Sequence, residues 1–373
     1  MPLIQKKISY NLQNLLGWKS KAKILVIESD DWGSIRMPSR NSFNNLFNGQ
    51  IPVDRCPYNS MDSLESNEDM EALYDVLTAF QDHKGNPLKI TANMIMANPD
   101  FSKIKASGFN EYHYEKFTDT YQRINGNLKV FDLIQEGVER SVFIPQLHGR
   151  EHIHVPAWLK VLKEGHRETM LAFENEVWGH PTNYFSGSKM NFSSSFQTRN
   201  PAEEAFAIES IKDAANLFRE FFGYTSESFI APRYIWPATI EKTLYEVGVK
   251  YIQGKIVQLL PKESNLSTKI HFMGSKNKYG QIYLARNVFF EPSQKPYFPW
   301  IKNALERIKI AFYWGKPAVI SMHRLNFMGG LNPENRNNNL KLLTRLISEV
   351  QKLYPDVIFL STNELGKFIE NGK

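Results

Sequence analysis

Residues 23–34, KILVIESDDWGS, decide the fold of this chain. Residues 24–27 form an apolar run rich in β-branched side chains, which predicts a strand buried on both faces. Asp30 and Asp31 follow, and two adjacent carboxylates at the end of a buried strand are costly unless a cation or a proton pairs with them. Since catalytic groups of parallel sheets and barrels collect at the carboxyl ends of strands, the stretch predicts a functional site there.

The rest of the chain alternates apolar runs with helical patterns, which favours an α/β fold with mostly parallel strands. We expect strands at residues 24–27, 88–96, 142–147, 228–231, 251–252, 318–322 and 357–360. We expect helices at residues 68–80, 130–140, 157–164, 202–222, 239–247, 300–314, 337–353 and 363–369, and a hairpin from 270–273 and 281–286. About seven strand–helix steps indicate a single distorted or incomplete (β/α) barrel.

The domain organisation follows from length and composition. The chain has 373 residues, 42% of them hydrophobic, which suffices for one large domain or two ordinary ones. No linker rich in Pro, Gly and Ser divides it, so we expect one catalytic domain over residues 21–373, preceded by an appendage of residues 1–20. Residues 172–200 are rich in Asn, Ser, Phe and Gly, which predicts either a lid over the site or a disordered surface loop.

Charge and cysteine content exclude several classes of protein. The net charge of +6 is spread along the chain, without the dense basic run or aromatic-interleaved basic patch of a nucleic-acid binder. Cys56 is the sole cysteine, which excludes an intramolecular disulfide and a Cys-rich zinc site and agrees with a reducing compartment. Without a signal-peptide apolar region or a long apolar span, we expect a cytoplasmic protein.

The N-terminal segment has the pattern of an amphipathic helix. Its apolar face and basic flank are formed by Ile8, Leu12, Leu15 and Leu16 and by Lys6, Lys7, Lys19, Lys21 and Lys23. A basic amphipathic helix over residues 4–23 can associate weakly with the anionic inner face of a membrane. The alternative, which we favour for such a segment, is packing of the apolar face on the body of the domain.

Two histidines follow the strand expected at residues 142–147. His148 and His152, in the sequence HGREH, share one face if the segment takes a helical turn, and both can then bind one divalent metal. Two unconnected surface histidines are the alternative. His323 also follows an expected strand, and in a parallel barrel all these strand ends open on the same side. Two imidazoles and one carboxylate would leave metal positions open for water and substrate, while the second carboxylate serves as a base and His323 as an acid.

These motifs together resemble the polysaccharide deacetylases, carbohydrate esterase family four, which have the NodB-homology fold. Residues 28–33 (ESDDWG) are similar to the family's Thr-Phe-Asp-Asp-Gly, and residues 148–152 are similar to its His-Ser/Thr-x-x-His. The strand that ends in His323 and the pattern LSTNEL at residues 360–365 match its late motifs. The order agrees over residues 24–369, nearly the whole chain.

The resemblance implies a role for each matching position. Asp30 matches the general base and His323 the general acid, and the metal ligands would be Asp31, His148 and His152. Arg233, in IAPRY at residues 230–234, lies where the family has an arginine that orients the base, although here it follows the proline. The family's aspartate beside the acid histidine has no match in residues 251–260.

The sequence therefore predicts a metal-dependent hydrolase, most simply with zinc, that removes an acetyl group from an N- or O-acetylated saccharide such as a nucleotide-linked or lipid-linked intermediate. Trp32, Tyr234 and Trp236 are candidates for stacking on sugar rings, with core packing as the alternative for Trp236. Two other functions stay open. One is a glycoside hydrolase that pairs Asp30 or Asp31 with Glu151, and the other is a non-catalytic carbohydrate-binding protein.

Overall fold

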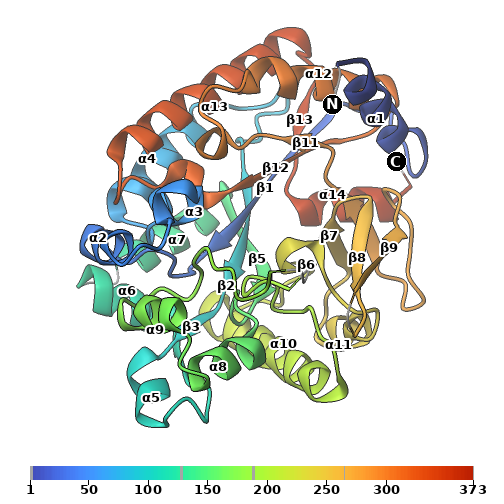
Figure 1. The fold of residues 1–373 in the computed structure, drawn as a ribbon. Helices are drawn as coiled ribbons and strands as arrows, with labels where there is room; N and C mark the ends of the chain where they lie inside the picture. Colours follow the sequence, from blue (N-terminus) through green and yellow to red (C-terminus); the bar gives the residue numbers. More distant parts are fainter. Residues whose placement is uncertain (1–2, 127–128, 187–189, 264, 373) are drawn as a thin grey trace.

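The computed structural model describes residues 3–126, 129–186, 190–263 and 265–372, and its centre is a curled parallel sheet (Figure 1). The strands follow the order β10-β7-β6-β5-β2-β1-β12-β11, and β13 also pairs with β1. Their bounds are β1 Ile24–Trp32, β2 Ile90–Ile95, β5 Phe143–Gly149, β6 Ser228–Ile230, β7 Tyr251–Gly254, β10 Ile282–Ala285, β11 Val288–Phe289, β12 Ala318–His323 and β13 Ile358–Phe359. Every pair in this sheet is parallel, as the alternation of strands and helices predicted.

The two ends of this sheet are formed by one continuous stretch of chain, residues 282–289. Its first part, β10, pairs with β7, and its second part, β11, pairs with β12. Between them the backbone N–H of Arg286 donates to the Gly254 carbonyl at 2.7 Å, and that of Asn287 donates to the Val319 carbonyl at 3.3 Å. On the opposite side, a single described residue pair, Leu147 with Phe229, joins β5 to β6. The sheet is therefore an incomplete, distorted barrel, as expected.

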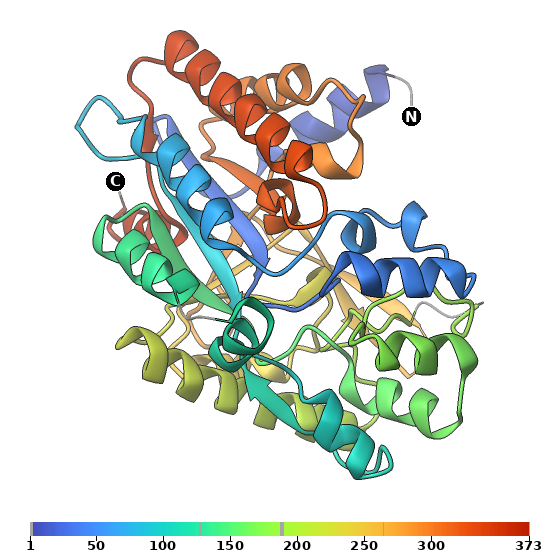
Figure 2. The same cartoon turned by 90° about the vertical axis from the view of Figure 1, so that its left-hand side faces the viewer.

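Helices surround the sheet on its outer side (Figures 1 and 2). Their bounds are α1 Leu3–Leu15, α2 Arg40–Asn48, α3 Pro57–Ser60, α4 Asn67–Thr78, α5 Phe101–Ala106, α6 Phe117–Asn125, α7 Lys129–Glu139, α8 Val155–Lys163, α9 Arg167–Glu174, α10 Pro201–Phe222, α11 Ile240–Glu246, α12 Trp300–Tyr313, α13 Pro333–Leu353 and α14 Thr362–Glu370. Capping explains several ends. Ser66 and Asp69 form a capping box at the start of α4, and α10 ends at Gly223, whose φ of 72° suits glycine.

Two smaller sheets correct the expected hairpin. The antiparallel pair is β8 Val257–Pro261 with β9 Leu266–Ile270, and a second pair joins β3 Ala97–Pro99 to β4 Tyr114–Lys116. The hairpin predicted from residues 270–273 and 281–286 is therefore only partly formed: Lys276 and Ile282 make an antiparallel bridge around its turn, whereas β9 pairs with β8 and β10 pairs in parallel with β7. The reason is burial, since Ile282 and Leu284 of β10 pack in a core cluster with residues of β1, which draws β10 into the parallel sheet.

The segment predicted as a lid or a surface loop, residues 172–200, packs inward over the part that the structure describes. Trp178, Phe192 and Phe196 are buried, and Trp178 lies in the same apolar cluster as residues of α5 and α8. The interpretation as a disordered surface loop is therefore wrong for these residues.

Helix α1 docks on the domain through the face opposite to the one expected. Its buried residues are Tyr10 and Asn14, and Asn14 accepts a hydrogen bond from Asn287 at 2.8 Å. The apolar face stays in solvent, with exposures of 54% for Ile8, 62% for Leu12, 38% for Leu15 and 53% for Leu16. Packing of that face on the body is thus wrong, and the membrane association remains a prediction. None of the helices in the described ranges is long and apolar enough to cross a bilayer.

We predict that this exposed face binds anionic vesicles weakly. Leu12 and Leu16 offer apolar area to the interface, and Lys19 and Lys21, which are exposed beside them, add about 1 kcal/mol each near an anionic surface. Co-sedimentation with phosphatidylglycerol vesicles measures the binding. It should disappear in Leu12→Ser/Leu16→Ser and persist in Leu353→Ser, a control with a leucine exposed elsewhere. Equal binding by both variants would contradict the prediction.

Candidate metal centre

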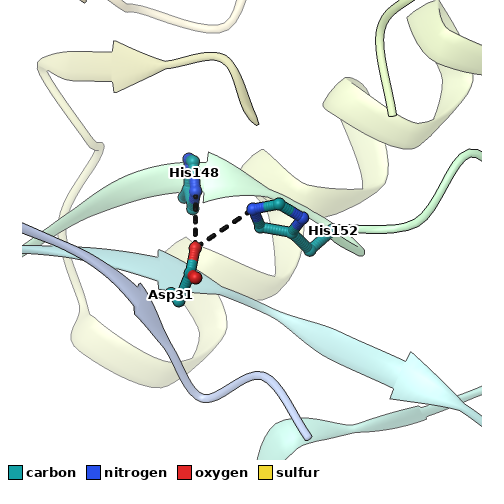
Figure 3. Close-up of side chains that lie close together, drawn as sticks. All are labelled: Asp31, His148 and His152. Carbon is teal, nitrogen blue, oxygen red and sulfur yellow. Dashed lines mark hydrogen bonds and ion pairs between the residues drawn. The ribbon is translucent and has the colours of Figure 1, made fainter. Parts of the chain in front are cut away.

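Asp31, His148 and His152 form a buried group at the carboxyl ends of β1 and β5 (Figure 3). Oδ1 of Asp31 lies 3.3 Å from Nε2 of His148 and 3.0 Å from Nε2 of His152. One ligand atom from each of the three residues lies within 4.8 Å of the others, so one cation can contact all three. This is the group of residues that the sequence predicted as metal ligands.

The protonation of the two histidines suits a cation. Nδ1 of His148 donates to the Ile230 carbonyl at 2.8 Å, which leaves the lone pair of Nε2 directed at the centre. Burial lowers the pKa of His152 to about 4 although Asp31 opposes the shift, so this ring is neutral at pH 7. Its Nδ1 has no hydrogen-bond partner among the described residues. Two neutral imidazoles and a carboxylate are a donor set that Zn²⁺ accepts, and three protein ligands leave room for water or substrate.

An irregularity in β1 brings both aspartates to the same site. The register between β1 and β2 shifts between Ser29 and Trp32, and Asp31 has a φ of 76°, which is strained for a residue with a Cβ. Side chains of a regular strand alternate between its faces, so the irregularity is what lets neighbouring carboxylates reach one centre. Gly33 continues the turn with a φ of 78°, and a Cβ there would lie 2.6 Å from the Ile95 carbonyl oxygen.

Asp30 is held by Arg286, a residue that the sequence did not single out. Nη1 and Nη2 of Arg286 donate to the two carboxylate oxygens of Asp30 at 2.6 and 2.7 Å, and Nε donates to Glu28 at 2.5 Å. Asn93 donates to Asp30 Oδ1 at 2.8 Å. Burial alone would raise the pKa of Asp30, but the charge and hydrogen bonds of Arg286 outweigh it and lower the pKa to about 2. Asp30 is therefore ionised and fixed in orientation.

His323 has a carboxylate partner in Glu291, the second residue that the sequence did not single out. The two lie 2.5 Å apart, from Nδ1 to Oε1, and Asn326 donates to the other oxygen of Glu291 at 2.9 Å. Burial would lower the pKa of His323, but the charge and hydrogen bond of Glu291, with smaller contributions from Asp31 and Asp30, raise it to about 9. His323 is therefore an imidazolium at neutral pH. It lies beside Asp30, its register partner across β12 and β1.

The other predicted site residues divide into two groups. Arg233, which has a φ of 57° in the 3-10 helix Pro232–Tyr234, is not the arginine that binds Asp30, because Arg286 donates to both carboxylate oxygens. Trp32 and Trp236 are completely withdrawn from solvent, so both belong to the core and neither can stack on a sugar. Tyr234 stays at the site, where its hydroxyl lies 3.3 Å from Arg286 Nη1.

Arg286 and Glu291 obey the same positional rule as the residues that were found. Each follows a strand at its carboxyl end, Arg286 after β10 and Glu291 shortly after β11. Reading residues 281–286 as one arm of a hairpin hid both, because a hairpin strand carries no expectation of a site at its end. The parallel pairing of that segment was the missing signal.

Comparison with known proteins found similarity to solved structures alone. No family model matches the chain, and no curated protein matches it. Among solved structures, a probable polysaccharide deacetylase from Pseudomonas aeruginosa PAO1 is 12% identical with a TM-score of 0.49, covering 93% of this chain and 91% of its own. A family 4 acetyl xylan esterase from Clostridium thermocellum, in complex with a cobalt ion, is 12% identical with a TM-score of 0.36, covering 93% of this chain and 91% of its own.

A third solved structure, the 4-alpha-glucanotransferase from Thermococcus litoralis, is 9% identical with a TM-score of 0.44. The match covers 92% of this chain but 40% of the transferase, so the chain spans less than half of that protein. Polysaccharide deacetylases are thus among the solved structures that this chain resembles.

We predict that Arg286→Met lowers the free energy of unfolding by about 3–5 kcal/mol, because it leaves the carboxylates of Asp30 and Glu28 buried without a counter-charge. Urea unfolding measures the loss. Arg140→Met, which removes an exposed arginine just after α7, should change the value by less than about 0.5 kcal/mol. Equal stability of the two variants would show that Arg286 does not stabilise the fold.

We predict that Glu291→Gln lowers the pKa of His323. The neutral amide removes the charge that raises this pKa, while the burial that lowers it remains, so the imidazole should lose its proton well below pH 9. A titration of the imidazole signals by NMR measures the shift, with His323→Ala to assign the signal. A midpoint that stays near 9 in Glu291→Gln would contradict the assignment of Glu291 as the cause.

Proposed function

We propose that the protein is a metal-dependent hydrolase that removes an acetyl group, or a related acyl group, from an acylated saccharide. The observation that carries the proposal is the placement of two polar pairs beside the group of Asp31, His148 and His152. One pair holds an ionised carboxylate, Asp30, and the other holds an imidazolium, His323. A metal site with a base candidate and an acid candidate next to it suits hydrolysis of an amide or ester.

The three ligand candidates would hold the cation, and zinc suits their two nitrogens and one oxygen. When bound, the divalent cation supplies positive charge that polarises the acyl carbonyl and acidifies water. Asp31 contributes the negative charge of the site, since burial would raise its pKa but the two imidazoles beside it outweigh burial and hold the pKa well below the usual range.

In the proposed reaction Asp30 accepts the proton of the attacking water. Arg286 binds both carboxylate oxygens and so keeps Asp30 ionised and correctly turned. A carboxylate with a pKa of about 2 is a weak base, so Asp30 suits a water that has been acidified rather than bulk water. The proton transfer thus depends on the metal site beside it.

His323 protonates the leaving group, which is an amine for an N-acetyl substrate and an alkoxide for an O-acetyl one. Its pKa of about 9 keeps it protonated at neutral pH, and Glu291 fixes the ring through Nδ1, so that Nε2 is the nitrogen left to donate. Glu291 is a positioning residue for His323 and takes the part that the resemblance assigned to an aspartate.

The geometry disfavours the glycoside hydrolase alternative, in which Glu151 would pair with Asp30 or Asp31. Both oxygens of Glu151 are engaged, by Arg150 at 2.6 Å and by Ser210 at 2.9 Å, and its side chain is buried. A non-catalytic carbohydrate-binding protein would bind an acetylated sugar without releasing acetate, which the following experiment distinguishes.

We predict that the zinc-loaded protein releases acetate from a panel of N- and O-acetylated sugars, and that a chelator abolishes the release. Asp31→Ala and His148→Ala should each lose bound metal, because each removes one of three ligands. Asp30→Asn should keep the metal and lose at least about 100-fold in kcat. Metal content by mass spectrometry and acetate release are the measurements.

His113→Ala is the control, since it removes a partly exposed imidazole outside the group. Stoichiometric metal in both Asp31→Ala and His148→Ala would refute the metal site. Metal binding without acetate release from any sugar of the panel would favour the carbohydrate-binding alternative.

A further inference from the structure

Three basic side chains border the site and take no part in the reaction proposed above. They are Arg36, Arg233 and Lys255. Among the described residues, none of them has a carboxylate oxygen within hydrogen-bond distance, and the nearest ion pair is that of Arg36 with Asp62 at 3.8 Å. Arg36 in particular needs an explanation, because it is buried and a desolvated charge with only a distant counter-charge is costly.

Arg36 presents the clearest case. Its side chain is 8% exposed, and Nε has no hydrogen-bond partner among the described residues. Oδ1 of the nearest carboxylate, Asp62, accepts a hydrogen bond from Arg324 at 3.0 Å, whereas Oδ2 lies 3.8 Å from Nε of Arg36, too far for a hydrogen bond. Burial raises the pKa of Asp62 to about 6, although both arginines oppose the shift. A buried guanidinium thus lacks the acceptor that buried arginines normally have.

Two aromatic rings place Arg36 against the centre. Its Cζ lies 4.5 Å from the ring of Trp178 and 4.9 Å from that of Tyr58. Trp178 in turn stacks on His152, with ring centroids 5.5 Å apart, and Tyr58 meets His323 edge-on at 5.4 Å. The ring of Trp178 therefore lies between the Arg36 guanidinium and the candidate ligand His152. The ring of Tyr58 lies between the guanidinium and the candidate acid His323.

The chain also makes room for this arginine. A Cβ on Gly179 would lie 2.9 Å from Nη1 of Arg36, so any larger residue there would push the guanidinium aside. Gly179 has an ordinary backbone conformation, since it is not among the described glycines with positive φ. Its lack of a side chain therefore serves the space around Arg36 rather than a turn.

Lys255 borders the site through a different pair of aromatic rings, those of Tyr234 and Phe289. Its Nζ lies 4.4 Å from the ring of Tyr234 and 5.1 Å from that of Phe289. Tyr234 contacts Arg286 through its hydroxyl, so Lys255 is one ring away from the arginine that holds Asp30. The residue as a whole is exposed, yet burial of its ammonium and the positive charge of Arg286 lower the pKa of Lys255, while Glu291 and Asp30 oppose the shift.

Arg233 is the third cation beside the site. It precedes Tyr234 in the chain, and although the residue as a whole is exposed, burial lowers the pKa of its guanidinium, with a further lowering by Arg36. Arg36 and Lys255 thus flank the candidate acid and the candidate base through the rings of Tyr58 and Tyr234. Cations gathered around one site favour binding of an anion.

We propose that Arg36, Arg233 and Lys255 form a subsite for a phosphoryl group of the acylated sugar. This inference rests on the proposed function for the sugar itself, but the subsite is defined by its own residues. Arginine forks and a lysine ammonium are the groups that proteins use for phosphate. Several cations suit a multiply charged phosphate better than a single carboxylate. The phosphoryl group can belong to a sugar phosphate, a nucleotide-linked sugar or a lipid-linked sugar.

The first test measures binding of inorganic pyrophosphate to the zinc-loaded protein by calorimetry, which requires no activity. Arg36→Met and Lys255→Met should each weaken binding about tenfold or more, the effect of losing one charge-assisted hydrogen bond. Arg140→Met and Lys309→Met, which remove exposed charges just after α7 and within α12, should leave it unchanged. Pyrophosphate held by the metal alone would bind Arg36→Met and Lys255→Met as tightly as the wild type, which would overturn the subsite.

The second test compares kcat/KM for an N-acetylated sugar with that for its 1-phosphate, its nucleotide diphosphate and its lipid diphosphate. At least one phosphorylated form should be preferred by the wild type, and Lys255→Met and Arg36→Lys should reduce the preference about tenfold, mainly through KM. The form with the highest kcat/KM identifies the source of the phosphoryl group. A purely structural role of Arg36 would reduce turnover of charged and uncharged sugars equally, which would overturn the proposal.

The two tests separate the subsite from the proposed function. Loss of pyrophosphate binding in the variants, without acetate release from any sugar, would support the subsite and refute the deacetylase. Acetate release from uncharged sugars, with no preference for a phosphorylated form and unchanged pyrophosphate binding, would refute the subsite and support the deacetylase.

Discussion

The bidentate ion pair between Arg286 and Asp30 is the interaction on which the rest of the structure depends. Arg286 lies in the stretch of chain that joins the two ends of the curled sheet, and it is fully buried. Besides the carboxylates of β1, its guanidinium donates to Gln253 of β7 at 3.1 Å and to Ser321 of β12 at 3.2 Å. One side chain thus binds three strands on different sides of the barrel, at the level where the candidate site begins.

Burial of this cluster requires the charges to match closely. Arg286 has two carboxylates to neutralise, and their pKa values move in opposite directions. Burial raises the pKa of Glu28 against the opposing effects of Arg286 and of the hydrogen bond from Thr362, whereas the pKa of Asp30 falls to about 2. Glu28 is therefore the carboxylate that more readily takes a proton, and a proton there leaves the Arg286–Asp30 pair neutral overall. Asp30 keeps its negative charge because Glu28 is the carboxylate of the two that can be protonated and so lose its charge.

How much of this could be predicted follows from where each residue lies. Asp30, Asp31, His148 and His323 come directly after apolar runs, so a rule about strand ends found them from the sequence. The partners of these residues were missed because pairing direction is a property of the tertiary structure. The sequence of β10 has the local pattern of a hairpin arm, and β10 pairs in parallel with β7 because its side chains are buried in a core cluster with those of β1. The predicted packing of helix α1 was wrong for a related reason. Its docked face is formed by polar residues, among them Asn14, which contacts Asn287. An amphipathic pattern tells which face is apolar and not which face meets the protein.

The cations around the site form two layers that differ in one respect. In the inner layer each positive group has a carboxylate, as Arg286 has Asp30 and His323 has Glu291. In the outer layer Arg36 and Lys255 lie against aromatic rings, and aromatic rings attract a cation without neutralising it. A carboxylate within hydrogen-bond distance in that layer would stabilise the free protein, yet it would also occupy the position of the anionic ligand that we propose. The charge that is incompletely balanced in the outer layer is therefore the part of the site that such a ligand would complete.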